Sequence, residues 1–147
     1  MNPIKPERKP PRVTLAETME DGESVAIARA LGDEIAAAFG PPEASPFSLR
    51  AHDGETLAGG LNGFIHWRWL YIRHFWIAPG WRGRGLGRRL LARADTEAKA
   101  RGCVGIYLDT FDPGAALFYE CCGYSRRGEI ANFPPGHSRV FLAKALA

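Results

Sequence analysis

The chain has 147 residues, 46% of them hydrophobic, which is typical of one domain with its own core. Its formal net charge of +3 is too small for a broad nucleic-acid-binding surface, and three cysteines, two of them adjacent, make neither a disulfide framework nor a spaced metal site. No apolar run reaches the roughly 18 residues of a membrane span and no signal-peptide core is present, so we expect a cytoplasmic protein without membrane or nucleic-acid partners.

The first third of the chain predicts an arm, a short strand and a helix. Residues 1–11 contain four prolines and alternating charges, which favours a flexible arm ahead of a single domain over 12–147. Residues 13–18 are a candidate for a short strand. Asp21 is a candidate N-cap for a helix over 22–39, which Gly40 would end.

The middle of the chain predicts three consecutive strands. Two β-prone runs, 47–52 and 56–67, flank Asp53-Gly54, a strong signal for a tight hairpin turn. A second tight connection, at Trp67-Arg68, leads into an apolar strand over 69–78.

The last part of the chain predicts two helices and three strands. The first helix begins at Gly85 or Leu86, and 105–110 has the composition of a buried strand. Asp112-Pro113 suits an N-cap and a first helical residue, and Gly123 would stop this short second helix. Strands over 124–129 and 138–143 complete the chain. The residues of the first helix expected to face inward are Leu86, Leu90, Leu91, Ala94 and Ala98.

The connection between the strand over 69–78 and the following helix carries alternating glycines at 83, 85 and 87. Glycine lets the main chain approach a bulky anion, and the first turn of a helix offers amide N–H groups without intrahelical partners. Arginines at 82, 84, 88 and 89 add positive charge. The segment therefore predicts a diphosphate cradle. Neither a P-loop nor the dinucleotide fingerprint G-x-G-x-x-G fits the spacing, and an ordinary strand–helix turn is the alternative.

Three segments resemble the GNAT superfamily of N-acetyltransferases. Arg82-Gly-Arg-Gly-Leu-Gly87 matches the family's Arg/Gln-x-x-Gly-x-Gly/Ala signature, in its place between a strand and a helix. The segment 116–124 resembles the family's A-x-x-Phe-Tyr-x-x-x-Gly-Phe/Tyr motif, and 132–144 looks like the ending of small bacterial-type members. The resemblance implies an α/β fold, in which a central mixed sheet is flanked by helices and the parallel strands at 69–78 and 105–110 splay apart.

The same resemblance implies acetyl-CoA as co-substrate and no metal. In the family, the cofactor arm enters the gap between the splayed strands, and a backbone N–H near Ile77 polarises the thioester carbonyl. Asp112 stands where relatives carry an asparagine. The cofactor-binding residues expected are Trp76, Ile77, Ala78, Arg82, Gly83, Arg84, Gly85, Leu86, Gly87, Arg88 and Asp112.

Tyr119 matches the family's general acid, which protonates the departing thiolate. The ordinary phenol pKa of about 10 keeps a tyrosine protonated at neutral pH, so that it can donate. The alternative is that Phe118 and Tyr119 form an aromatic pair in the core.

The proton acceptor for the incoming ammonium is less evident. Relatives often carry a carboxylate on the strand matching 69–78, where this chain has Arg73 and His74. His74 could be the catalytic base, or it could pack as an ordinary strand histidine, and water alone could suffice. Arg73 favours an acceptor that bears a carboxylate or phosphate. Alternation along a strand lets only one of the two face the cleft unless a bulge intervenes. His137 is a further substrate-binding candidate, in a loop that it could equally shape.

These features favour an N-acetyltransferase that acetylates the primary amine of a small molecule by direct attack in a ternary complex. Two alternatives keep the fold: an acetyltransferase for protein N-termini or lysines, and a non-catalytic acyl-CoA-binding regulatory module. The absence of an acidic patch speaks against the first, and the presence of Tyr119 speaks against the second. The sequence leaves a homodimer open.

Overall fold

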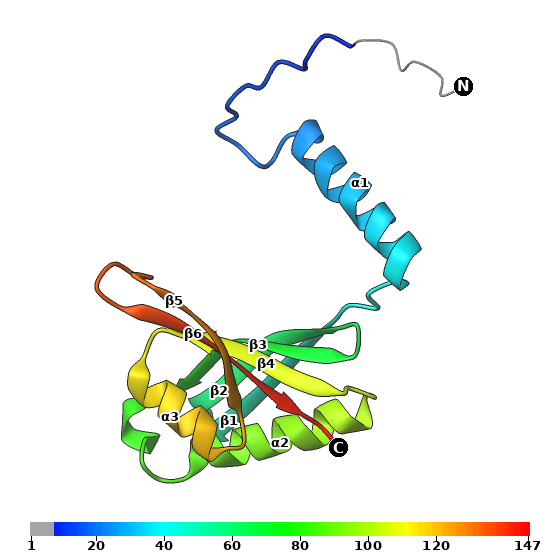
Figure 1. Ribbon diagram of the computed structural model, residues 1–147. Helices are drawn as coiled ribbons and strands as arrows, with labels where there is room; N and C mark the ends of the chain where they lie inside the picture. The colour runs from blue at the N-terminus through cyan, green and yellow to red at the C-terminus, as the bar shows by residue number, and fades with distance from the viewer. Residues whose placement is uncertain (1–7) are drawn as a thin grey trace. The chain divides into compact units, whose positions relative to one another are not determined.

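The computed structural model describes residues 8–147, which fall into two units divided between Pro41 and Pro42. The first unit contains the helix α1 (Gly22–Phe39; Figure 1). The Asp21 side chain accepts a hydrogen bond from the Ser24 N–H at 2.8 Å, which satisfies one of the free donors of the first turn. At the other end, Gly40 has a φ of 81°. Both expected ends of this helix are confirmed.

The strand expected over 13–18 was wrong. The segment has no regular secondary structure, and Val13 and Leu15 are almost fully exposed. A strand needs a neighbour to take its backbone hydrogen bonds, and none of the strand pairings in the described chain includes these residues. Residues 8–11 of the expected arm likewise carry no regular structure, and 1–7 lie outside the described residues.

The second unit is built on a six-stranded mixed sheet with the order β1-β2-β3-β4-β6-β5. Every pair of neighbours is antiparallel except β3 and β4, which are parallel. The expected strands are confirmed, with ends that differ by a few residues. The strands are β1 (Ser45–Asp53), β2 (Thr56–His66), β3 (Trp69–Ile77), β4 (Gly105–Thr110), β5 (Ser125–Ala131) and β6 (Ser138–Ala145).

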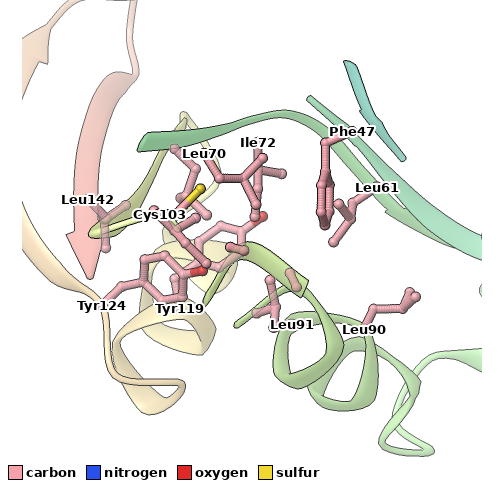
Figure 2. Packing of buried hydrophobic residues seen from close by; sticks show 14 of the residues in the cluster. Phe47, Leu61, Leu70, Ile72, Leu90, Leu91, Cys103, Tyr119, Tyr124 and Leu142 are labelled. Atoms are coloured by element: carbon pink, nitrogen blue, oxygen red, sulfur yellow. The ribbon is translucent and has the colours of Figure 1, made fainter. Parts of the chain in front are cut away.

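The helices α2 (Leu86–Ala100) and α3 (Pro113–Cys121) pack against one face of this sheet. The apolar stripe of α2 is confirmed residue by residue, because the five residues expected to face inward are the ones that are buried. Figure 2 shows Leu90 and Leu91 of α2 on the same side of the strands as Phe47 and Leu61. No helix in residues 8–147 is long and apolar enough to cross a membrane.

The two parallel strands part before they end. Their pairing begins at Trp69 with Gly105 and stops at Ile72 with Leu108. Beyond that point β3 continues to Ile77 without a partner on this side. The expected splay is therefore present, and it opens a gap in the sheet next to α3 and the first turn of α2.

Candidate active site

A cavity of about 550 Å³ lies beside the unpaired end of β3, between the first turn of α2 and α3. It brings together most of the residues that the sequence predicts for cofactor binding, and Tyr119 with them. The residues that line it are Phe75, Trp76, Ile77, Trp81, Arg82, Gly83, Gly85, Leu86, Gly87, Arg88, Asp112, Ala115, Phe118 and Tyr119.

The connection from β3 to α2 has the backbone geometry of an anion cradle. A single 3-10 turn (Pro79–Trp81) follows β3, and Gly83 and Gly85 then take φ values of 73° and 82°. Residues with a side chain rarely adopt this left-handed region, so the turn favours glycine at both positions. Gly85 is the N-cap of α2 and has no side chain to bond the first amide groups, which therefore remain available to a ligand.

Gly87 has a different role from the two turn glycines. A Cβ at this position would lie 3.1 Å from Phe118 Cζ and 3.5 Å from Phe75 Cζ. These two rings line the cavity, so the absence of a side chain at Gly87 lets the α2 backbone approach them closely.

Of the three arginines expected to bind the cofactor, Arg82 and Arg88 line the cavity. The Arg82 Nε donates to the carbonyl oxygen of Ile77 at 2.9 Å, which ties the turn to the end of β3. Arg84 is not among the lining residues, and its guanidinium lies 5.5 Å from the centre of the Trp81 ring. Ala78 is also outside the lining, and its N–H donates to Ala58.

Tyr119 is buried on α3 and lies among three other aromatic rings. Its ring centre is 6.0 Å from that of Phe75, 5.7 Å from Phe118 and 5.9 Å from Tyr124. Burial, followed by the nearby negative charges of Asp109 and Asp112, raises the pKa of Tyr119 to about 12. The phenol therefore keeps its proton throughout the neutral range, in contact with the cavity.

Asp112 caps α3, as its position before Pro113 predicts. Its carboxylate accepts from the Gly114 N–H at 2.9 Å, and its own N–H donates to Thr110 Oγ1 at 3.1 Å. Asp112 also lines the cavity, so the carboxylate is part of its wall.

A bulge in β3 changes the expected placement of Arg73 and His74. His74 pairs with Asn62, whereas Ile72 pairs with the next residue of β2, Gly63, so that Arg73 is an extra residue on β3. Ile72 and Phe75, on either side of the bulge, both pack against the core. Arg73 and His74 therefore both lie on the face of the sheet opposite α2 and α3. Neither lines the cavity.

The face opposite α2 and α3 carries a cluster of rings, and we call it the aromatic face. Tyr71 of β3 and Tyr107 of β4 are stacked with their centres 4.8 Å apart, and Phe64 of β2 lies 5.5 Å from Tyr71. His74 and Trp76 line a smaller hollow of about 220 Å³ outside the main cavity. Trp76 lines both hollows.

The structure places His137 away from the cavity, in the exposed turn between β5 and β6. Its N–H donates to the Pro134 carbonyl at 2.8 Å, and its carbonyl accepts from Phe133 at 3.0 Å. These bonds show that its backbone shapes the turn, which was one of the two expectations.

Sequence reasoning missed the aromatic lining and one carboxylate. The rings of Phe75 and Phe118 stack in the cavity with their centres 6.3 Å apart. Alternation along β3 assigns Phe75 to the correct face only when the bulge before it is known. Asp109 follows the buried Leu108, so alternation places it on the aromatic face. Its partners come from β3 and β6, far away in the sequence, and local patterns do not reveal them.

A second, larger hollow of about 1010 Å³ lies between β1 and α2. Its lining contains none of the cradle glycines and no tyrosine, although it includes Arg50, Arg89 and Arg93. Because this hollow lacks both the glycine turn and Tyr119, the smaller cavity is the better candidate.

The known proteins that this chain resembles are acetyltransferases. The model of the acetyltransferase (GNAT) family matches residues 11–124. Blasticidin-S acetyltransferase of Streptomyces morookaense is 43% identical over 91 residues, which are 61% of this chain and 67% of that protein. A crystal structure from Agrobacterium tumefaciens, assigned as an acetyltransferase, is 32% identical and superposes with a TM-score of 0.79 over 91% of this chain and 98% of its own.

A more distant structure shares the fold alone. It is assigned as a streptothricin acetyltransferase from Bacillus anthracis and was solved with acetyl coenzyme A. It is 23% identical, with a TM-score of 0.63 over 69% of this chain and 63% of its own.

Proposed function

Because the chain belongs to the GNAT family of acetyltransferases, we propose that it transfers an acetyl group from acetyl-CoA to the primary amine of a small molecule. The transfer would occur by direct attack within a ternary complex. The observation that carries this proposal is the cavity in which the glycine cradle, two arginines and a protonated buried tyrosine meet at the gap between β3 and β4.

The cradle fits a diphosphate. Gly83 and Gly85 keep side chains out of the turn, and Gly85 leaves the first amides of α2 without a capping side chain. Arg82 and Arg88 would neutralise the charge of the phosphates. Arg82 is already oriented through its bond to Ile77, and its remaining guanidinium donors are available.

The apolar part of the cavity lining fits the arm of the same molecule. Phe75, Phe118 and Ala115 offer an apolar wall to a flexible chain. Acetyl-CoA supplies an activated thioester, so the protein needs to position two reactants and manage protons. The wall residues exclude water, and backbone N–H groups at the end of β3, near Ile77, are the candidates to stabilise negative charge on the carbonyl oxygen.

We assign the general acid to Tyr119. Its raised pKa keeps the hydroxyl protonated, and its place in the cavity wall lets it donate that proton to a departing sulfur. His74, on the aromatic face, is the candidate to take a proton from the amine, and His137 is a candidate for substrate contact. Blasticidin-S acetyltransferase, as its name says, acts on a small molecule, which supports a small acceptor here as well.

The test combines calorimetry with a thiol-release assay. The protein should bind CoA, should not bind NAD or ATP with similar strength, and should release thiol from acetyl-CoA only when an amine is added. The amine panel comprises amino acids, polyamines, aminoglycosides and short peptides. Peptides as the only acceptors would favour the protein-modifying alternative. CoA binding without thiol release on any amine would favour the non-catalytic module.

A further inference from the structure

Arg73 and Asp109 mark the point at which the sheet opens. The last paired residues of the parallel strands are Ile72 and Leu108, and Arg73 and Asp109 are the residues that follow them. Ile72 and Leu108 are both buried in the core beneath α2 and α3. Alternation places Asp109 on the aromatic face, and the bulge places Arg73 there as well. A cation and an anion therefore follow the last paired residues of the two strands, where the gap begins.

The Asp109 carboxylate is held in a fixed orientation. Its Oδ1 accepts from Arg139 Nε at 2.7 Å and also from Arg139 Nη2, and its Oδ2 accepts from the Tyr71 hydroxyl at 2.8 Å. Arg139 is itself fixed, with its guanidinium 4.8 Å from the centre of the Phe133 ring. The side chain of Asp109 retains 11% of its exposure. Since a carboxylate oxygen accepts two hydrogen bonds, Oδ2 has room for one further donor.

Arg73 contrasts with this arrangement. It is exposed, and none of the ion pairs formed within residues 8–147 involves it. The bulge gives it no ladder partner of its own on β2, so that it lies at the edge of the gap. Its positive charge is free to bind an anion, preferably one with the planar geometry of a carboxylate or the oxygens of a phosphate.

The cavity on the other side of the sheet approaches the same gap. Tyr119, in the cavity wall, has its ring centre 6.0 Å from that of Phe75, which lies on β3 two residues beyond Arg73. A reactant that enters from the aromatic face would therefore meet Asp109 and Arg73 before it reaches a group held in the cavity.

We propose that the acceptor is a small zwitterion, which binds its amine to Asp109 Oδ2 and its anionic group to Arg73. This inference rests on the proposed function and narrows the acceptor to amino-acid-like molecules. Asp109 orients the amine at the mouth of the gap, and Arg73 selects molecules with a carboxylate or phosphate nearby. Arg139 and Tyr71 position the carboxylate of Asp109 and do not contact the acceptor's anionic group.

The substrate arm of the test compares matched acceptors. The twenty free amino acids, their carboxamides and simple monoamines are assayed for thiol release at saturating acetyl-CoA. The best free amino acid should exceed its own carboxamide in kcat/KM by roughly 10- to 100-fold, the size of a lost charged hydrogen bond. Arg73→Gln should remove this preference. Arg127→Gln, an exposed arginine on β5, is the matched control and should retain it.

The second set of experiments distinguishes binding of the acceptor amine by Asp109 from a purely structural role of its ion pair with Arg139. Asp109→Asn should raise the KM for the amino acid by about 10-fold and leave CoA binding unchanged. The double variant Asp109→Asn with Arg139→Gln removes both charges, so that no unpaired arginine remains. The raised KM should persist in it. Asp95→Asn is the matched control, because Asp95 also forms a half-buried ion pair, with Lys144, but lies away from the gap.

The outcomes are distinguishable. Wild-type protein that acetylates carboxamides as well as free amino acids would overturn the inference and leave the proposed function intact. So would a double variant whose KM returns to the wild-type value. The Arg73 arm can be read even if Asp109→Asn does not fold, since Arg73 forms no ion pair of the described fold. Absence of CoA binding, in contrast, would overturn the proposed function itself.

Discussion

The rings of Phe75 and Phe118 stack in parallel across the cavity, with their centres 6.3 Å apart and their planes only 6° from parallel. They belong to β3 and α3, and Gly87 of α2 lies so close to both that a Cβ on it would be 3.1 Å from Phe118 and 3.5 Å from Phe75. The width of the cavity therefore depends on a residue without a side chain. This relationship links the glycine motif, which is local, to a wall that is built from distant parts of the chain.

Gly87→Val should weaken CoA binding strongly. The added Cβ would lie 3.1 Å from Phe118, so the stacked pair must shift into the cavity or α2 must move away. Overpacking of this kind costs about 1–3 kcal/mol, which corresponds to roughly a 5- to 150-fold loss of affinity if the whole cost falls on CoA binding. Calorimetry with CoA measures it. Gly80→Val is the control, because a Cβ there would meet nothing within 4 Å. Normal CoA affinity in the Gly87 variant would remove the cavity from consideration as the CoA site.

Tyr119→Phe should lower turnover by about 10²- to 10⁴-fold and leave CoA affinity almost unchanged. The variant keeps the aromatic contacts with Phe75 and Phe118 and loses only the hydroxyl that can donate a proton. Tyr124→Phe is a close control, since Tyr124 is equally buried, lies 5.9 Å away and has a hydroxyl without a hydrogen-bond partner. Single-turnover thiol release separates the chemical step from product release. Equal rates for wild type and Tyr119→Phe in that assay would assign the residue to packing.

The sequence predicts those features that depend on residues close together in the chain. The caps at Asp21 and Asp112, the stripe of α2 and the glycine turn depend on residues within one or two turns of each other, and all are confirmed. The side of the sheet on which Arg73 and His74 lie depends on a bulge against β2. That bulge is a property of the pairing between two strands, and the sequence of β3 alone does not encode it.

The same distinction explains the two clearest failures. The segment 13–18 has the composition of a strand, but composition does not say whether an edge is available to pair with it. Asp109 was missed because a single carboxylate in a strand is unremarkable until Tyr71 and Arg139 are known to hold it. Those partners lie 38 and 30 residues away along the chain.

The raised pKa of Tyr119 predicts a loss of stability at alkaline pH. The phenol ionises near pH 10 in the unfolded chain but only at about 12 in the folded protein, so the unfolded state releases its proton first. Stability that is fully present below about pH 10 is therefore lost as the pH rises toward 12, by on the order of 1 kcal/mol per pH unit.

Urea unfolding at pH values of about 8, 9.5 and 10.5 should show this decline in the free energy of unfolding. Tyr119→Phe should decline less steeply, with the remaining slope due to other buried tyrosines such as Tyr124, whose pKa burial also raises. Parallel curves for the two proteins would contradict the burial of an ionisable phenol at this site.

Replacing Arg82 should weaken CoA binding more than replacing Arg84, although the two are separated by one residue. Arg82 lines the cavity and its Nε bonds to Ile77, so Arg82→Gln removes a phosphate-binding charge and loosens the turn from the end of β3. Arg84 lies over Trp81 outside the lining, so Arg84→Gln should change affinity only slightly. We expect about a 10-fold or larger loss of CoA affinity for the first variant and less than about 3-fold for the second at moderate salt.

Calorimetry at two salt concentrations checks the electrostatic origin of this effect, because salt screening should narrow the difference in CoA affinity between the two variants. Arg82→Lys should recover only part of the affinity, since lysine restores the charge but has no second donor group to hold both Ile77 and a phosphate in a fixed geometry. Equal losses for Arg82 and Arg84 would instead indicate that both arginines act through the net charge of the turn.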